Sequence, residues 1–588
     1  MRKGCFEKKI LAFLMAIAIS ISLIACGNTG ESAKESSNST VQQASQSTES
    51  MPSKEPVTLK IYTNAKMSNY GIQKNPVAEE IEKATGVTMD FVANPSEETL
   101  KIMLAGGDLP DIISLSATVY AKQLIEGSNI IAMDDLLKTN GKDIVSLNPK
   151  RVEFSKKYLS NNAGKVYLLP YAAIASTKQI ASDFSYECSA IRWDYYKELG
   201  CPEINNWDDL ISVLAQMQKN HPKTQDGRKI YGLGAFTDWG TFPFTGLHSY
   251  GNNANSSDIC GHTVYVDKDG NIKQTYNDEN SIFWQSMRDW NKAYKANIVD
   301  PDSFTQKWAN FSEKGNNGQY LFEPFNWQFY GVNVKLAKEE NPEAGFVPIY
   351  TVFPYVSRIS LTAIGDAGGS VGITSKCKAP DRAMDLINFF ATYEGCRMLW
   401  SGVKGTHWDI ENGKPEFKDE VFEKKSTDAT YLENEGIGKY TVLAAWYGNA
   451  IDPNDGVPMD LTKTTKAYKK LITPLEKSFN DFYKVDYPGQ LCDKLVAEGT
   501  ISFRNNIFVA ARGALGYGSD DIKRIDTQIV SYISKEIPKL IMAKTDTDFS
   551  NEYKTTIEEL EKLGLKTSVE YWTKEFNRCM SIAVEFKP

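Results

Sequence analysis

The chain has 588 residues, of which 41% are hydrophobic and 24% are charged. At ~150 residues per domain this length predicts two to four domains. The composition excludes a wholly disordered chain, a collagen-like fibre and a polytopic membrane protein. The 66 basic and 74 acidic residues give a formal net charge of −8, with no long basic run. Because nucleic-acid binding needs a cationic surface, we expect no nucleic-acid partner.

The first 25 residues have the pattern of a secretory signal peptide. Basic residues precede an apolar run over 10–25, which is shorter than the about 20 residues of a permanent membrane span. The run ends in Leu-Ile-Ala followed by Cys26, which resembles the lipobox of bacterial lipoproteins. In that class the new N-terminal cysteine is lipidated, and two acyl chains hold a domain on a membrane. The alternative is a simple signal peptide that happens to precede a cysteine.

Residues 26–56 follow as a tether that starts at the lipidated cysteine. This stretch is rich in serine and contains no aromatic residue, so it cannot offset the entropy of folding. A flexible coil of this length spans about 30 Å. The sequence therefore predicts a protein anchored on the extracellular side of a cell membrane, as in Gram-positive bacteria, and not inserted in the bilayer.

Strands and helices alternate at the start of the folded part. The expected segments are a strand over 57–62, a helix from Asn75-Pro76 to Gly86, a strand over 87–92, a helix from Asn94-Pro95 to Gly106-Gly107, and a strand over 111–115. Asparagine before proline is typical of a helix start, and glycine of a helix end. This alternation predicts a parallel α/β sheet. Ligands lie beyond the carboxyl ends of such strands, where Asn64 and Ser116 stand.

Later segments repeat this pattern, and together they resemble one family. The segments that carry the resemblance are Asn75–Gly86, Leu104–Ile112, Gly164–Pro170, Ile191–Gly200 with Trp207–Leu210, and Val371–Lys376 with Pro380 and Tyr393–Gly395. In this order, behind a lipobox, they resemble family 1 extracellular solute-binding proteins, the receptors of carbohydrate ABC importers. The stretch Glu559–Gly564 looks like a long lipoprotein subgroup whose members often handle oligosaccharides.

The resemblance implies an α/β, two-lobed, periplasmic-binding-protein-like fold of type II, with lobes joined by a hinge and a ligand cleft between them. Lobe 1 is expected over 57–170 plus 347–395, and lobe 2 over 171–346 plus 396–588. The family's mechanism is closure of the lobes on the ligand. We expect a monomer that binds an oligosaccharide and delivers it to ABC permease subunits in the membrane.

Sugars have polar edges and apolar ring faces, so their sites need aromatic side chains beside hydrogen-bonding groups. The resemblance places Trp327, in the sequence Glu-Pro-Phe-Asn-Trp-Gln, facing the cleft after a strand. Trp239 and Trp446 lie in glycine-containing loops. The other candidate ligand-binding residues are Trp408, Asn64, Ser116, Arg192 and Asp366. Core packing or a plain surface position is the alternative for each of them.

Two further segments contain partial patterns of other functions. The stretch from Gly368 to Gly372 fits the hydrolase pattern G-x-S-x-G around Ser370, but that pattern requires a helix directly after the serine. Here the sequence continues as a strand, and a helix is expected only from Pro380. The loop from His221 to Arg228 lies where some relatives hold calcium, but it is rich in basic residues. We therefore expect no catalytic residue, cofactor or metal. An oligopeptide receptor, a surface polysaccharide hydrolase or lyase, and a non-transport sensor stay open.

Overall fold

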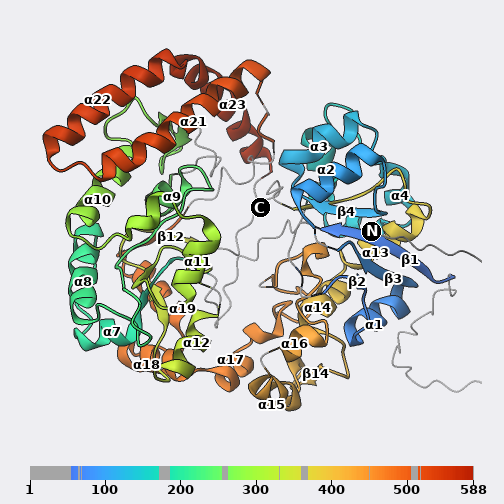
Figure 1. Cartoon of the computed structure of the whole chain (residues 1–588). Coiled ribbons are helices and arrows are strands. Elements are labelled where there is room, and N and C mark those ends of the chain that lie inside the picture. Colours follow the sequence, from blue (N-terminus) through green and yellow to red (C-terminus); the bar gives the residue numbers. More distant parts are fainter. Residues whose placement is uncertain are drawn as a thin grey trace, which may run out of the picture. The chain divides into compact units, whose positions relative to one another are not determined.

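The computed structural model describes the chain from residue 55 to residue 586, except 64–66, 68, 94, 171–185, 255–262, 330, 359–368, 429, 449, 505–513 and 517. Figure 1 labels the elements of the described part. The expected signal peptide, the lipidated Cys26 and nearly all of the tether lie outside the described residues. No helix in the described part combines the length and the apolar character needed to cross a bilayer.

A six-stranded sheet gathers strands that lie far apart in the sequence. Its strands, in spatial order, are β2 (Gly71–Ile72), β3 (Val87–Phe91), β1 (Val57–Thr63), β4 (Ile112–Leu115), β13 (Ser370–Ile373) and β5 (Leu169–Pro170). β1 pairs in parallel with β3 and β4, which confirms the predicted parallel α/β core. β2, β13 and β5 join antiparallel to their neighbours, so the complete sheet is mixed.

The helix signals of this region are largely confirmed. Asn75 caps α1 (Pro76–Thr85) by accepting a hydrogen bond from the backbone N–H of Ala78, and Gly86 ends α1 in the left-handed conformation. The second helix begins later than expected: α2 (Glu97–Gly106) is capped by Ser96. A serine hydroxyl caps as well as an asparagine amide does, and Ser96 lies two residues after the expected start at Asn94.

Further helices follow in the first part of the chain and around the return strand β13. They are α3 (Ala117–Glu126), α4 (Asp134–Thr139), α5 (Lys142–Leu147), α6 (Pro149–Tyr158), α13 (Pro380–Phe389), α14 (Tyr393–Ser401), α15 (Asp419–Thr427), α16 (Tyr431–Asn434), α17 (Thr465–Leu471), and the 3-10 turns η2 (Thr441–Leu443) and η3 (Leu461–Lys463), with the hairpin β14 (Trp408–Glu411) and β15 (Lys414–Phe417). One hydrophobic core joins the six-stranded sheet to side chains from α13 through to Ala467. Residues 396–467 thus pack with the first sheet.

A second group of elements gathers around several further hydrophobic cores. Its strands form the sheet β10 (Phe322–Glu323), β7 (Ser189–Arg192) and β11 (Phe346–Ile349), the sheet β16 (Ser502–Phe503), β12 (Tyr355–Arg358) and β6 (Tyr186–Glu187), and the hairpin β8 (Val264–Val266) and β9 (Ile272–Gln274). Its helices are α7 (Trp193–Glu198), α8 (Trp207–Asn220), α9 (Phe242–Gly251), α10 (Ile282–Lys295), η1 (Pro301–Phe304), α11 (Trp308–Asn316), α12 (Val332–Glu339), α18 (Pro474–Tyr483), α19 (Pro488–Ala497), α21 (Asp520–Ile541), α22 (Asp546–Lys562) and α23 (Leu565–Glu585). β7 runs antiparallel to both of its neighbours. Its Ile191 side chain packs in a hydrophobic core with side chains of α8, α10 and α21. Gly564, in the left-handed conformation, separates the last two helices, α22 and α23.

Candidate functional site

Three partly exposed tryptophans from separate segments meet in one place. Trp239 precedes α9, Trp308 is the first residue of α11, and Trp327 follows β10. The rings of Trp239 and Trp308 stack with centroids 4.8 Å apart, and the ring of Trp327 lies 6.1 Å from each of them. We call these three residues the tryptophan cluster. Its partly exposed rings give a broad aromatic surface of the kind that stacks on the apolar face of a ligand ring.

Two hydrogen bonds hold the segments of Trp239 and Trp308 together. The backbone N–H of Trp308 donates to the carboxylate of Asp238 at 2.9 Å, and the N–H of Thr237 donates to the carbonyl of Gln306 at 3.0 Å. Behind the cluster, the buried ring of Phe236 packs 5.2 Å from Trp239 and 5.1 Å from Trp308. The two loops therefore act as one support, and the two indole rings are set before a ligand arrives.

A buried carboxyl group fixes the turn that carries Trp327. Oε1 of Glu323 accepts hydrogen bonds from the backbone N–H groups of Gln328, at 2.9 Å, and Phe329, at 2.7 Å. Burial raises the pKa of Glu323 to about 8, although the two backbone donors act to lower it. Since both bonds span the position of Trp327, Glu323 determines where that ring stands.

Aromatic contacts continue from Trp327 to a buried arginine. Phe325 stacks on Trp327 with centroids 5.5 Å apart, and Tyr250 packs edge-on against Phe325 at 5.3 Å. The guanidinium of Arg504 lies 4.0 Å from the centre of the Tyr250 ring and is 7% exposed. A hydrogen bond of 3.3 Å from Arg504 to the carbonyl of Ala254 also holds the guanidinium. The site thus joins aromatic faces to a cationic hydrogen-bond donor.

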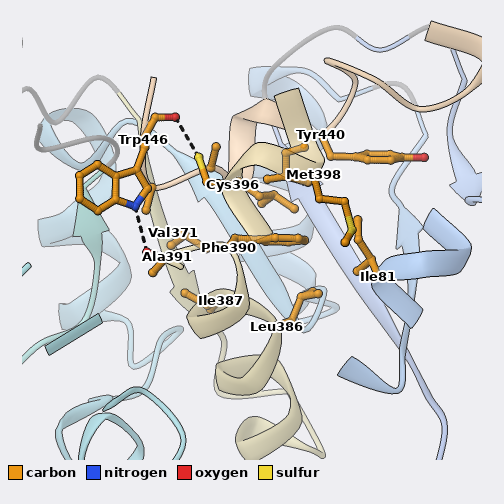
Figure 2. Close-up of a cluster of buried hydrophobic side chains, with 14 of the residues drawn as sticks. Ile81, Val371, Leu386, Ile387, Phe390, Ala391, Cys396, Met398, Tyr440 and Trp446 are labelled. Carbon is orange, nitrogen blue, oxygen red and sulfur yellow. Dashed lines mark hydrogen bonds between the residues drawn. The ribbon is translucent and has the colours of Figure 1, made fainter. Parts of the chain in front are cut away.

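The structure separates the other two predicted tryptophans from this cluster. Trp446 is 4% exposed in the first core, where its indole N–H donates to the carbonyl of Ala391 at 2.9 Å (Figure 2). Its own carbonyl accepts from the thiol of Cys396. Trp408 begins β14 and donates to the carbonyl of Gly402 at 2.8 Å. Both tryptophans have packing roles in this structure, and we leave them outside the proposed site.

The polar candidates also lie outside the cluster or outside the described residues. Arg192 is fully buried and pairs with Asp194 and Glu340, an arrangement that serves the core beside β7. Ser116 is half-buried at the carboxyl end of β4, where it precedes α3. Asn64 and Asp366 lie outside the described residues.

Sequence reasoning missed Trp308 and Arg504. Trp308 begins a helix, and its periodic pattern is that of an ordinary amphipathic segment, so only the fold brings it to Trp239. Arg504 sits at the end of a two-residue strand with no motif around it. The stacking of Trp239 with Trp308 depends on a contact across about 70 residues, which no local pattern encodes.

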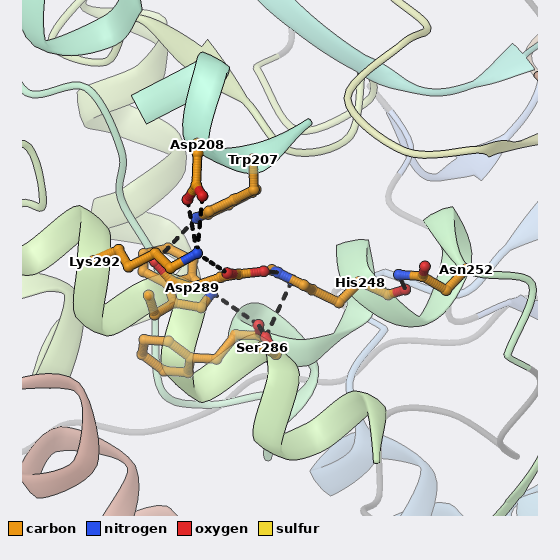
Figure 3. A network of polar contacts seen from close by, with 9 residues as sticks. Trp207, Asp208, His248, Asn252, Ser286, Asp289 and Lys292 are labelled. Atoms are coloured by element: carbon orange, nitrogen blue, oxygen red, sulfur yellow. Dashed lines mark hydrogen bonds and ion pairs between the residues drawn. The ribbon is translucent and has the colours of Figure 1, made fainter. Parts of the chain in front are cut away.

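Two arrangements that resemble hydrolase sites have structural roles here. Figure 3 shows Ser286, His248 and Asp289 in hydrogen-bonding order: Ser286 Oγ lies 3.1 Å from His248 Nδ1, and His248 Nε2 lies 3.1 Å from Asp289. However, Ser286 is fully buried and donates its proton to the carbonyl of Phe244, while His248 is 2% exposed. A nucleophile must reach its substrate, and this serine is enclosed.

Ser370 is equally unsuited to be a nucleophile. It opens strand β13, is fully buried, and is followed by strand residues up to Ile373. The next helix, α13, starts only at Pro380. This confirms the prediction that the sequence continues as a strand, so the sharp strand-to-helix turn of a nucleophile elbow does not form.

The loop proposed for calcium in some relatives forms a basic turn. Thr224 accepts from the backbone N–H of Arg228 and donates to Asp226, whose carboxylate also pairs with the Arg228 side chain at 3.1 Å. Within the described part of the chain, no group of histidine, cysteine, aspartate and glutamate side chains is arranged to hold a metal ion.

Comparison with known proteins identifies the family. Residues 65–395 match the family model described as bacterial extracellular solute-binding protein. A search of curated proteins finds no match. Solved structures match over nearly the whole folded part of the chain.

Alginate-binding protein AlgQ2, in a structure without calcium ion, is 18% identical with a TM-score of 0.54, covering 89% of this chain and 99% of that one. The substrate-binding protein FusA of an ABC transporter from S. pneumoniae, in complex with kestose, is 17% identical with a TM-score of 0.57, covering 89% and 100%. An HMO-binding, ABC-transporter-associated solute-binding protein from Bifidobacterium longum infantis is 13% identical with a TM-score of 0.57, covering 89% and 99%.

The family match spans more than half of the chain, so the chain belongs to the bacterial extracellular solute-binding proteins. It has the α/β fold of periplasmic-type solute-binding proteins. As a member of this family it is a solute-binding protein, a role that involves no catalysis.

Proposed function

We propose that this protein is a membrane-anchored receptor that captures an oligosaccharide for an ABC importer. The observation that carries this proposal is the tryptophan cluster, in which three partly exposed indole rings lie within 6.1 Å of one another. An oligosaccharide offers several apolar ring faces in a row, which suits a broad aromatic surface. Structural neighbours described as binding alginate, kestose and HMO support this ligand class.

We further propose that the ligand is enclosed by closure of two lobes. Lobe 1 includes the six-stranded sheet, and because residues 396–467 share its core, we extend this lobe to about residue 471. Lobe 2 consists of the elements around β7 and the core beside it, and it includes α18 and α19, which follow lobe 1 in the sequence. The tryptophan cluster belongs to lobe 2, so contacts from lobe 1 would complete the site and select the closed state.

Location and partners follow from the same proposal. A lipid on Cys26 and the tether up to residue 56 would keep the receptor near the membrane, where permease subunits accept the ligand. Changing Cys26 to Ser should move the protein from the membrane fraction to the medium when the natural host or a Gram-positive host expresses it. Retention of the variant on the membrane would contradict the anchor, without bearing on the ligand.

The test of the ligand is thermal unfolding of the purified chain with panels of oligosaccharides and peptides. A ligand at a hundred times its dissociation constant adds about 2.7 kcal/mol of stability. In a chain of this size that is a shift of about one or two degrees, so a change in tryptophan fluorescence must accompany it. We expect one oligosaccharide class to give both signals and to be recovered intact.

The other outcomes separate the alternatives. If only peptides give both signals, the fold assignment stands and the protein is an oligopeptide receptor. Recovery of cleaved sugar would contradict the non-catalytic role. Binding of an oligosaccharide by a chain whose deletion leaves uptake of that sugar unchanged would favour a sensor.

A further inference from the structure

A cavity of about 360 Å³ lies behind the turn that carries Trp327, between the sheet of β7, β10 and β11 and the helices α12 and α18. Its floor is formed by buried residues of the sheet, including Ala190 and Phe346, which are 3% and 5% exposed. Its rim is open to solvent, because Val334 is 71% exposed and Thr473 is also exposed. A small molecule therefore has both a way in and room to be enclosed.

Two carboxyl groups face this cavity. Glu323 is 3% exposed, and only its Oε1 is engaged, by the two backbone donors of the Trp327 turn; within the described part of the chain, Oε2 accepts no hydrogen bond. Glu476 on α18 also lines the cavity, and its Oε2 accepts hydrogen bonds from the N–H and the hydroxyl of Thr473. Burial raises the pKa of both carboxyl groups.

No basic side chain among the described residues lines the cavity beside these carboxyl groups; Lys425, which is not a lining residue, acts on Glu476 from outside and works to lower its pKa. Among the described lining residues, β7, β11, α12 and the start of α19 contribute no titratable side chain, and none of the lining residues is lysine, arginine or histidine. The amide of Asn333 is committed to both the N–H and the carbonyl of Phe346. Once these carboxyl groups ionise, the interior has a potential that favours a cation and disfavours an anion.

The walls indicate which kind of cation fits. The lining includes the aromatic residues Phe329, Phe346 and Phe479, with aliphatic residues between them. Aromatic faces attract organic ammonium groups, and hydrocarbon gains from leaving water against apolar walls. A bare metal ion would need about six oxygen ligands, which a mostly apolar lining does not offer.

We propose that this cavity is a second binding site, separate from the tryptophan cluster, for a small organic cation of the alkylammonium class. The ammonium group contacts the free carboxylate oxygen of Glu323, and its hydrocarbon part lies against the phenylalanine rings. Because the same carboxyl group holds the turn of Trp327, the cation also alters the surroundings of that indole.

The test is calorimetric titration of the whole chain with cyclohexylammonium chloride and, in parallel, with neutral cyclohexanol. We expect the ammonium ion to bind with a dissociation constant near ~1 mM, as suits a ligand with so few atoms, and cyclohexanol to bind at least about tenfold more weakly. Below the raised pKa of Glu323, binding of the cation must release a proton. The heat measured in buffers of different ionisation enthalpy should reveal that proton, and binding should tighten as the pH rises toward about 8.

Two variants locate the cation. Glu323→Gln keeps an oxygen for the two backbone donors but loses the charge, so we expect about a tenfold or greater loss of affinity and no proton release. Glu476→Gln should weaken binding less, because Oε2 of Glu476 is already engaged by Thr473. Equal binding of cyclohexanol, unchanged affinity in Glu323→Gln, or no binding of the ammonium ion by the wild-type chain would each overturn the proposal. Oligosaccharide binding by the same preparation is scored separately, so failure of this site leaves the transport proposal untouched.

Discussion

At the scale of single residues, the tryptophan cluster makes a direct prediction. Trp327→Ala should weaken binding of the oligosaccharide identified by the unfolding screen by about tenfold, since an aromatic stacking contact contributes about 0.5–1.5 kcal/mol beyond its buried area. Titration calorimetry measures this. Trp400→Ala is the matched control, because Trp400 is a partly exposed tryptophan that packs on the first core. Equal losses of affinity in both variants would show that the ligand does not bind at the tryptophan cluster.

Glu323 makes a prediction about pH. Its pKa rises from 4.5 to about 8 on folding, so between these values the folded chain holds a proton that the unfolded chain has lost. The contribution of Glu323 to the free energy of unfolding is therefore fully present at low pH and is lost as the pH rises through this window. The loss is at most about 1.4 kcal/mol per pH unit.

The measurement is the urea midpoint of the wild type and of Glu323→Gln at several pH values between 4.5 and 8. The glutamine cannot ionise, so the variant should gain stability relative to the wild type as the pH rises. The difference between the two proteins cancels the other titrating groups. Parallel curves would show that Glu323 titrates normally.

At the scale of elements, α1 depends on a cap that also reaches another segment. The side-chain oxygen of Asn75 accepts from the N–H of Ala78, and its amide donates to the hydroxyl of Tyr440, which is fully buried. Asn75→Ala should cost about 1–2 kcal/mol, since a lost cap alone costs about 1. Hydrogen exchange of the peptide covering α1 should accelerate by roughly 5–30-fold.

Asn75→Asp separates the two contacts of this cap. It keeps the oxygen for Ala78 and removes the amide donor to Tyr440, so its exchange rate should lie between those of the wild type and the alanine variant. An aspartate variant as fast as the alanine variant would place most of the stability in the contact with Tyr440 instead of in the cap.

Local signals also explain what could be predicted from the sequence. The Asn75 cap, the Gly86 end and the alternation around Leu59 and Ile61 depend on neighbours within a few residues, so α1 and β1 were correctly predicted. The antiparallel entry of β13 beside β4 joins residues some 260 positions apart, and no periodicity records such a partner. The same limit applies to the candidate site. The resemblance pointed to Trp327 as a candidate, whereas only the fold brings Trp308 and Arg504 to its neighbourhood.

Trp446 illustrates the opposite error. Glycine-containing loops favour exposed positions, yet this indole is buried, and its N–H donates to the carbonyl of Ala391, two residues after α13 ends. A buried polar group needs a partner, and the sequence could not indicate that one was available.

At the scale of the whole molecule, a solute-binding protein works by shifting between conformations, and a ligand can shift them only by its difference in affinity for each. In the proposed function, the tryptophan cluster supplies ligand contacts from the second lobe alone. Closure therefore requires that the ligand, once stacked there, also gains contacts from the six-stranded sheet, for which the carboxyl ends of β1 and β4 are the expected place.

This argument predicts a measurable change of size. A compact chain of the folded length has a radius of gyration of about 24 Å, and an open two-lobed form exceeds that value. Small-angle scattering should show the radius falling toward it when the oligosaccharide saturates the wild type. Trp327→Ala, at the same ligand concentration, should show a smaller fall that full saturation restores, because the variant loses affinity and keeps the hinge. If calorimetry records binding while the radius stays constant, the ligand sits on one lobe and capture does not proceed by closure.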